Sequence, residues 1–320
     1  MTDFEVRRDD LRQTRFVEGA PDGNVRIDRF ALTANNVTYG VMGDTLSYWE
    51  FFGASEEGWG RVPVWGIGTV LETGQQVYGY FPMSSHVTMQ LDERLVERSP
   101  HRADLPATYN RYMPVEPGTP HLDEMLLLRP LFGTSFLLSD FLARDEGTVV
   151  LGSASSKTAY GLAFLLDGPV VGLTSERNRA FVESLGVYDR VLSYGEVDAL
   201  RGEAIVFVDM AGDGRVRDAV HAAADVRRSV GVGATHWEQL GGGAQGEFFF
   251  APSHIEKLLA EVGPEELQRR MGEAWGALMA RVGDWMEVEH GSGPEHVERV
   301  WRALVDGDVD PRRGHVLTLP

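Results

Sequence analysis

The chain has 320 residues, of which 43% are hydrophobic and 24% are charged, an ordinary balance for a globular protein of one large or two smaller domains. Its net charge of −18 argues against non-specific binding to nucleic acid. Because it has no cysteine, disulfides and thiolate metal sites are excluded.

Histidine spacing and the N-terminal sequence indicate whether the protein binds a metal ion or carries a signal peptide. The nine histidines are scattered and form no H-x-x-x-H or H-E-x-x-H pair, so we expect no metal site. The opening stretch, MTDFEVRRDDLRQTRF, lacks the apolar core of a signal peptide. No apolar stretch is expected to span a bilayer. We therefore expect a cytoplasmic protein that binds a small molecule rather than a membrane.

The first third of the chain has the pattern of β-strands. Residues 24–36 (NVRIDRFALTANN) and 62–72 (VPVWGIGTVLE) alternate apolar and polar side chains. Residues 73–91 continue with short strands that Gly and Pro interrupt, which indicates a small barrel-like β domain. Residues 97–120 are polar and rich in proline, so they are expected to form a loop or a boundary.

From about residue 126 the pattern becomes an alternation of helices and strands. Residues 126–145 have helical spacing, and a helix over 253–282 is expected to break at Gly263–Pro264. The alternation predicts parallel βαβ units and a doubly wound sheet. Predicted strands are 147–153, 169–175, 203–212, 226–236 and 246–252, and residues 188–195 are predicted to form a short strand or a turn. Predicted helices between or after them are 156–168, 176–186 and 213–225. Residues 284–291 and 314–320 are β-like and flank a helix over 294–307.

One strand-to-helix junction, VVLGSASSKTAYGLAFLL over residues 149–166, suggests a phosphate-binding turn. The free N–H groups at the start of a helix, together with its dipole, attract phosphate. The hydroxyls of Ser155, Ser156 and Thr158 can bond phosphate oxygens, and Lys157 can supply a positive charge. Three interpretations stay open: a dinucleotide turn, a P-loop whose second Gly is replaced by Ser156, and simple capping of the helix.

The end of the next predicted strand favours NADP over NAD if the turn binds a dinucleotide. That strand ends about twenty residues beyond the turn, where a side chain normally contacts the adenosine ribose. An acidic side chain there favours binding of a free 2′-hydroxyl, whereas hydroxyl side chains and an arginine or lysine favour binding of a 2′-phosphate. The sequence has Thr174, Ser175, Glu176 and Arg177, so these hydroxyls and Arg177 are candidate ligands of NADP(H). Gly212, after the fourth strand of this region, is expected near the ribose.

The order of these segments resembles the zinc-free branch of the medium-chain dehydrogenase/reductase superfamily, the quinone oxidoreductase-like proteins. The resemblance spans nearly the whole chain and suggests a divergent subgroup of the DUF2855 type. It rests on residues 25–44, 65–89, 131–138, 148–166, 172–196 and 296–319. The resemblance implies an α/β fold with a GroES-like β domain (1–120 and 283–320) and a Rossmann doubly wound parallel-sheet domain (121–282), with the substrate in the cleft between them.

The resemblance also implies site residues and an assembly. It carries Arg177 onto the basic residue for the 2′-phosphate and Tyr194 onto an adenosine-side tyrosine. It places Asn36 and Thr134 near the nicotinamide. It further implies a homodimer formed partly through residues 246–252 (GEFFFAP). The sequence departs from the family at the turn, where the three glycines correspond to Ser153, Ser155 and Thr158.

Three side chains are candidate acids for the chemistry: Tyr39, Lys157 and His236. Three functions remain open from the sequence. The first is an NADPH-dependent reductase of an activated C=C or C=O bond. The second is an enzyme of the same fold that performs non-redox acid–base chemistry on a carbonyl substrate. The third is a nucleotide-binding protein without catalysis.

Overall fold

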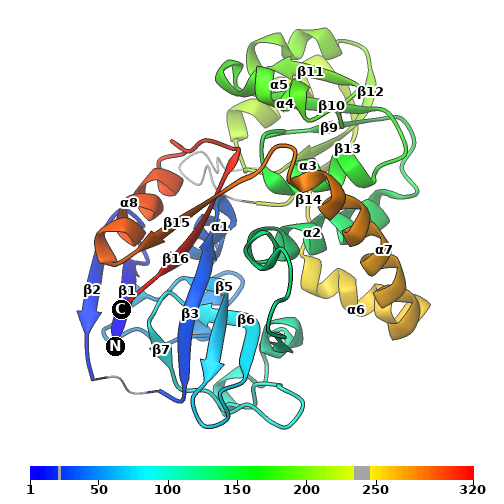
Figure 1. Ribbon diagram of the computed structural model, residues 1–320. Coiled ribbons are helices and arrows are strands. Elements are labelled where there is room, and N and C mark those ends of the chain that lie inside the picture. The colour runs from blue at the N-terminus through cyan, green and yellow to red at the C-terminus, as the bar shows by residue number, and fades with distance from the viewer. Residues whose placement is uncertain (21–22, 234–245) are drawn as a thin grey trace. The chain divides into compact units, whose positions relative to one another are not determined.

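The computed structural model describes residues 1–20, 23–233 and 246–320, and these residues form two compact units. Unit 1 consists of Met1–Arg129 with Glu287–Pro320, and unit 2 consists of Pro130–Met286. Most strands and helices of both are labelled in Figure 1.

Unit 1 is built mainly from antiparallel strands, as alternation in the first third predicts. A three-stranded sheet has the order β2-β1-β4, and a larger sheet has the order β15-β16-β3-β5-β6-β8, with β7 also paired to β3. The strands are β1 (Thr2–Arg7), β2 (Thr14–Glu18), β3 (Val25–Leu32), β4 (Trp59–Gly60), β5 (Pro63–Val70), β6 (Gln76–Pro82), β7 (His86–Val87), β8 (Met113–Pro114), β15 (Glu287–Ser292) and β16 (Arg313–Thr318).

Helices also contribute to unit 1, and one of them is not expected from the sequence. Helix α8 (Pro294–Val305) follows the prediction and connects β15 to its parallel partner β16. Helix α1 (Ala34–Val41) lies where only an Asn-containing segment was expected after β3. Its β-branched and aromatic side chains have weak helix propensity, so the pattern does not reveal it.

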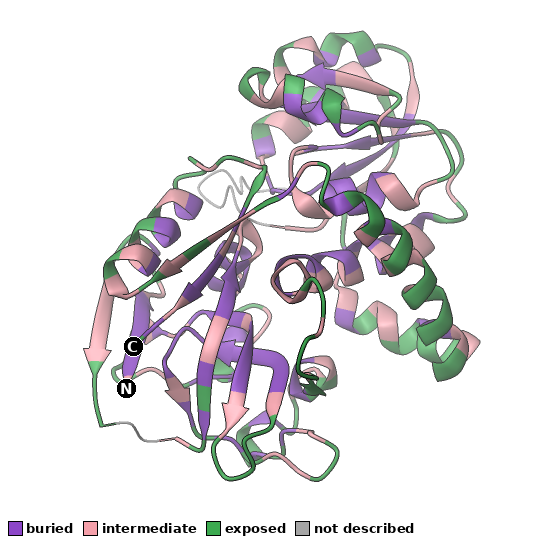
Figure 2. Ribbon diagram, in the orientation of Figure 1, coloured by how far each residue is buried: buried purple, intermediate pink, exposed green. Residues whose placement is uncertain are grey.

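Most of β3, β5 and β6 is buried (Figure 2).

Unit 2 contains a six-stranded parallel sheet of the predicted doubly wound kind. The strand order is β11-β10-β9-β12-β13-β14, and every pair in it is parallel. This is the order 3-2-1-4-5-6 of the Rossmann arrangement. The strands are β9 (Thr148–Leu151), β10 (Val170–Thr174), β11 (Arg190–Ser193), β12 (Ala204–Asp209), β13 (Asp225–Gly231) and β14 (Glu247–Phe248).

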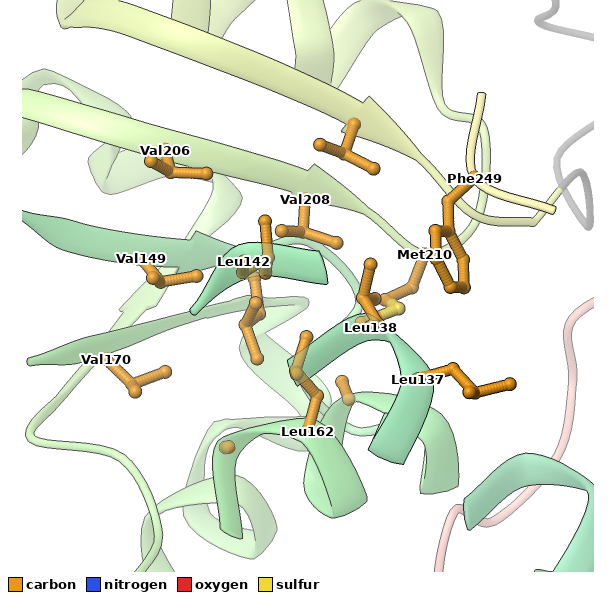
Figure 3. Packing of buried hydrophobic residues seen from close by; sticks show 14 of the residues in the cluster. Leu137, Leu138, Leu142, Val149, Leu162, Val170, Val206, Val208, Met210 and Phe249 are labelled. Atoms are coloured by element: carbon orange, nitrogen blue, oxygen red, sulfur yellow. The ribbon is translucent and has the colours of Figure 1, made fainter. Parts of the chain in front are cut away.

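Apolar side chains cover both faces of this sheet because neighbouring strand residues point in opposite directions. Val149, Val206 and Val208 point to the face that Leu138 and Leu162 cover (Figure 3). The other face is buried by a separate cluster that includes Val150, Ile205 and Phe207. The helices of unit 2 are α3 (Lys157–Leu165), α4 (Arg179–Ser184), α5 (Gly214–Ala223), α6 (Ala251–Val262) and α7 (Pro264–Val282), with α2 (Leu122–Leu142) entering it from unit 1.

Helix α2 corrects one expectation, because it is 21 residues long and its most apolar window has a mean hydropathy of 1.4. By length and composition it is able to cross a bilayer, although half of that window is buried inside the protein. Leu137, Leu138 and Leu142 of α2 belong to the core cluster of Figure 3. The burial identifies α2 as a core helix of this fold.

Two further predictions meet different outcomes. The break at Gly263–Pro264 is confirmed: Gly263 has φ 80°, which favours glycine, and it separates α6 from α7. The strand predicted over 246–252 is wrong in extent. Only Glu247–Phe248 pair with β13, and α6 begins at Ala251. Pro252 at the start of α6 explains the early end, since proline suits the first helical turn.

Candidate functional site

The carboxyl edge of the parallel sheet in unit 2 is the natural place for a ligand. The chain runs from β9 outward to β10 and β11, then returns to β12 on the other side of β9. The connection that follows β9 therefore leads to one side of the sheet, and the connection that follows β12 leads to the other side. In doubly wound folds, ligands bind at the carboxyl ends of strands at such a reversal.

The turn from β9 to α3 is held firmly at this edge. The N–H of Gly152 donates to the carbonyl of Val208 at 2.8 Å, and that of Ala154 donates to Leu173 at 2.9 Å. The turn is thereby bonded to the strands on both sides of β9. Ser156 is the N-cap of α3, and its hydroxyl accepts from the N–H of Ala159 at 3.2 Å.

Ser153 keeps the left-handed backbone that glycine usually supplies in such turns. Its φ is 51°, a region that few non-glycine residues adopt. The hydroxyl oxygens of Ser153 and Tyr194 are 3.3 Å apart, which gives the serine side chain a partner. Burial is the main cause that raises the pKa of Tyr194, so the phenol remains a neutral donor at this edge.

Close packing beneath the turn fixes its position, and sequence reasoning missed the residues that do this. A Cβ atom at Gly172 of β10 would lie 2.9 Å from the Cβ of Ala154, so glycine is required there. The Tyr188 hydroxyl donates to the carbonyl of Ala154 at 2.7 Å. Asn178 donates to the hydroxyl of Ser155 at 3.2 Å. The glycine in the second strand is the sequence signal that could have indicated this close approach.

Two hydroxyls at the end of β10 are buried without a hydrogen-bond partner among the described residues: Thr174 Oγ1 and Ser175 Oγ. Only 1% of Thr174 is exposed. A buried hydroxyl without a partner costs free energy, so a ligand or water that bonds it is favoured. Arg177 follows in an exposed 3-10 turn, Glu176–Asn178. The next arginine, Arg179, is bound to Glu196 at 2.8 Å and to Glu183 at 3.2 Å.

The turn after β12 is closed by a buried carboxylate. Asp209 Oδ1 accepts the N–H groups of Gly212 at 2.8 Å and Ala211 at 3.1 Å. Burial raises the pKa of Asp209, while these two bonds act in the opposite direction. Gly212 has φ 76°, which such a tight turn requires. This places Gly212 at the same sheet edge as the turn after β9.

Lys157 is the first residue of α3, the position where a cation opposes the helix dipole. Its ammonium nitrogen lies 6.0 Å from the ring centroid of Trp285. The same ring lies 4.8 Å from that of Tyr160, one turn further along α3. Attraction to the indole therefore offsets part of the dipole penalty.

The remaining candidates divide between the units. Thr134 in α2 is partly buried, and its hydroxyl donates to the carbonyl of Pro130 at 3.2 Å. Asn36 and Tyr39 lie on α1 in unit 1. His236 lies outside the described residues. No group of three or more acidic or histidine side chains suited to a metal ion occurs within the described ranges.

Both polar atoms of the Asn36 side chain make hydrogen bonds inside unit 1. Its Oδ1 accepts the backbone N–H of Thr33 at 2.8 Å, and its Nδ2 donates to the carbonyl of Pro63 at 2.9 Å. It therefore caps α1 and ties this helix to β5. A contact from Asn36 to a cofactor would have to compete with these bonds.

Tyr39 lies in a cluster of aromatic side chains over β5 and β6. Its hydroxyl accepts a hydrogen bond from the indole of Trp65 at 3.2 Å, and its ring lies 4.6 Å from that of Tyr48. Burial raises the pKa of Tyr39 to about 12, although hydrogen bonds with Trp65 and Asn35 act in the opposite direction. The phenol is therefore protonated at neutral pH, as a general acid must be.

One protein family and several solved structures match nearly the whole length of the chain. The family described as a protein of unknown function, DUF2855, matches residues 30–310. CurA from Vibrio vulnificus, solved in complex with NADPH, has TM-score 0.59 and 14% identity over 96% of this chain and 94% of its own. The yhdH oxidoreductase from Salmonella enterica in complex with NADP has TM-score 0.53 and 14% identity, covering 100% of both chains. The quinone oxidoreductase from Coxiella burnetii has TM-score 0.53 and 14% identity, over 100% and 99%. No curated protein matches the chain in sequence.

Proposed function

Because the chain belongs to the DUF2855 family and has the GroES-like and Rossmann parts of the medium-chain dehydrogenase/reductase fold, we propose that it is an NADPH-dependent reductase. Its substrate is a small molecule with an activated C=C or C=O bond. The observation that carries the proposal is the pair of hydroxyls of Thr174 and Ser175 at the end of β10, which are buried and have no hydrogen-bond partner among the residues that the structure describes.

The residues around these hydroxyls fit the adenosine end of NADPH. Oxygens of a 2′-phosphate are suited to accept from both hydroxyls and from the guanidinium of Arg177. Tyr194 stands at the next strand end and serves as the adenosine-side aromatic. Two similar structures, CurA and yhdH, hold NADPH and NADP respectively, which supports the same class of nucleotide here.

The pyrophosphate is assigned to the start of α3. The positive end of the dipole of this helix attracts anions, and Ser153, Ser155, Ser156, Lys157 and Thr158 lie at or beside it. Gly212 leaves room at the neighbouring turn for the ribose. Thr134 is assigned to the nicotinamide side, and Asn36 keeps a supporting part because its side chain already caps α1.

NADPH, when bound, supplies a hydride to the electrophilic carbon of the substrate. The protein must then deliver a proton to the atom that gains negative charge. Tyr39 is our first candidate for this donor, because it is neutral and its hydroxyl accepts from Trp65. Lys157 and His236 are the alternatives to test beside it.

Titration calorimetry with NADPH and NADH, followed by an assay of NADPH oxidation at 340 nm with enones and quinones, tests the proposal. We expect NADPH to bind with clear preference and at least one acceptor to be reduced. Absence of NADPH binding would overturn the proposal. In the assay, Tyr39→Phe should lower kcat while leaving NADPH affinity unchanged.

A second function is favoured by one observation, the loss of all three turn glycines. The side chains of Ser153 and Ser155 are already bonded to Tyr194 and Asn178. A turn without these glycines fits two alternatives to the reductase. In the first, the protein binds a nucleotide without catalysis. In the second, it is an enzyme that performs acid–base chemistry on a carbonyl substrate. NADPH binding without oxidation by any acceptor would favour the non-catalytic form. Turnover of a carbonyl substrate without cofactor would favour the non-redox enzyme.

The assembly is proposed as a homodimer in the cytoplasm. The edge strand β14 is short, and 46% of Phe248 is exposed on it. An apolar residue at an unpaired strand edge favours pairing with a second chain. Light scattering at micromolar concentration is expected to give twice the monomer mass of 35.4 kDa, and a monomer would contradict the proposal.

A further inference from the structure

An arginine stands in the apolar helix α2 beside the aromatic cluster of unit 1. Arg129 follows three leucines and is partly buried. Its guanidinium lies 5.7 Å from the ring centroid of Tyr78. Within the described residues, no hydrogen bond or ion pair reaches this side chain. Since arginine stays charged, a partly buried guanidinium without an anion is a site for one.

The tyrosine beneath Arg129 is also incompletely bonded. The hydroxyl of Tyr78 is buried and has no hydrogen-bond partner in the part of the chain that the structure describes, and the same holds for Tyr80. These two residues are two apart on β6, so they share a face of the sheet. Burial raises the pKa of both phenols. Both are therefore neutral donors with no acceptor.

A partly exposed indole connects this pair to the candidate proton donor. The ring of Trp65 on β5 stacks on Tyr78 with centroids 5.5 Å apart, and it lies 5.2 Å from the ring of Tyr80. The same indole donates to the Tyr39 hydroxyl at 3.2 Å. Trp65 is partly exposed, whereas the tyrosines around it are buried. Trp65 therefore contacts both Tyr78, which lies beneath Arg129, and the hydroxyl of Tyr39.

We propose that Arg129 and Tyr78 bind the carboxylate of the substrate, which is a planar unsaturated carboxylic acid that stacks on Trp65. This deepens the proposed function and rests on it, since it names the class of acceptor. The guanidinium supplies paired N–H donors that match a carboxylate, and Tyr78 supplies a third. The carboxylate positions the substrate and takes no part in the bond changes of the reduction.

The test measures binding to the protein without cofactor, so it does not depend on turnover. trans-Cinnamate and its neutral analogue cinnamamide are titrated by calorimetry at fixed salt. Wild type should bind cinnamate about tenfold or more tightly than cinnamamide, the range of a charge-assisted hydrogen bond. Arg129→Gln should remove this preference while leaving cinnamamide binding within about twofold. Tyr78→Phe should reduce it in part.

Two further variants separate this result from changes in fold or total charge. Arg129→Lys keeps the charge but loses the planar pair of donors, so it should retain only part of the preference. Arg94→Gln removes an exposed arginine elsewhere in unit 1 and should bind both probes as wild type does. If Arg129→Gln unfolds at the same temperature as wild type, its loss of preference for cinnamate is a local effect at the binding site.

The outcomes distinguish this inference from the proposed function. Equal binding of the two probes to wild type, binding of neither, or an Arg129→Gln variant with full preference overturns the inference. NADPH affinity is measured on the same samples and should be equal in wild type and Arg129→Gln. Absence of NADPH binding to wild type overturns the proposed function, and the cinnamate titration still decides whether Arg129 and Tyr78 bind a carboxylate.

Discussion

The hydroxyl of Ser153 lies 3.3 Å from the hydroxyl of Tyr194. This contact joins the turn after β9 to the segment after β11, and β10 lies between these two strands in the sheet. It therefore spans the ends of three strands. A serine in a backbone conformation suited to glycine is held there by its own side chain.

Exchange of Ser153 should separate backbone strain from the loss of this contact. Ser153→Gly relieves the positive φ but removes the bond to Tyr194, so we expect a change in unfolding free energy of less than about 1 kcal/mol. Ser153→Val cannot adopt φ 51° without strain, and we expect it to lose about 1–3 kcal/mol. Urea denaturation of the three proteins measures the difference. A valine variant as stable as wild type would contradict this account.

Nucleotide preference should depend on Arg177. Charge-assisted bonds to a phosphate contribute about 1.5–3 kcal/mol each, so wild type should prefer NADPH over NADH by about tenfold or more. Arg177→Ala should erase most of this preference and leave NADH affinity unchanged. Arg227→Ala, an exposed arginine on β13, is a matched control. Equal affinities of wild type for the two cofactors count against the assignment.

Lys157→Met removes the charge at the start of α3 and keeps the length of the side chain. The variant should fold with an unchanged or higher melting temperature, because a cation there opposes the dipole by about 0.3–1 kcal/mol. Its affinity for cofactor or substrate should fall by about 1–3 kcal/mol. Calorimetric unfolding and cofactor titration give the two values. Undiminished binding would make Lys157 a structural neighbour of Trp285 only.

The tyrosines should titrate only when the protein unfolds. All nine have a raised pKa, with burial as the largest cause in every case. A raised pKa in the folded state gives stability that is fully present below the unfolded pKa of about 10 and is lost as pH rises through the folded pKa, about 12 for Tyr39. Stability should therefore fall from about pH 10 upward.

Absorbance at 295 nm and circular dichroism, recorded together against pH, check this expectation. Tyrosinate absorbance should appear in the same transition as the loss of the circular dichroism signal. Several tyrosines that ionise near pH 10 in a folded protein would show that the aromatic cluster of unit 1 is open to water.

Activity should not require a metal ion. The sequence holds no cysteine and no H-x-x-x-H or H-E-x-x-H pair, so the usual zinc-binding motifs are missing. Dialysis against EDTA should leave NADPH binding, turnover and melting temperature unchanged. Stoichiometric zinc that survives purification, detected by elemental analysis, would refute this prediction.

Much of the fold could be predicted because the parallel sheet has a strong local signal. Buried strands such as β9 and β12 are continuous apolar runs, and Ser156 marks the helix start between strand and helix. Helix α1 had no such signal. The strand expected over 246–252 was too long because its phenylalanines suit a strand and a helix entrance equally.

Candidate site residues could be proposed from the sequence only where they follow a strand. Thr174 and Ser175 are candidates of this kind. That their hydroxyls are buried without a partner among the described residues could not be foreseen, because hydrogen bonding depends on packing. Asn36 was expected near a cofactor, yet its side chain caps α1 and bonds to β5. Tyr188, Asn178 and Arg129 gain their importance from neighbours distant in the chain, which no local pattern reveals.

Strand β16 has a consequence for the order in which the protein is made. Its residues His315, Val316 and Leu317 pair with Leu32, Ala31 and Phe30 of β3, nearly the whole chain away. Unit 2 is continuous, so it can fold while the ribosome is still adding residues. Strand β3 can pair with β5 early, but it must wait for β16 until residues 313–318 have been added. A nascent chain stopped at residue 286 would thus carry a finished parallel sheet and an antiparallel sheet that still lacks β15 and β16.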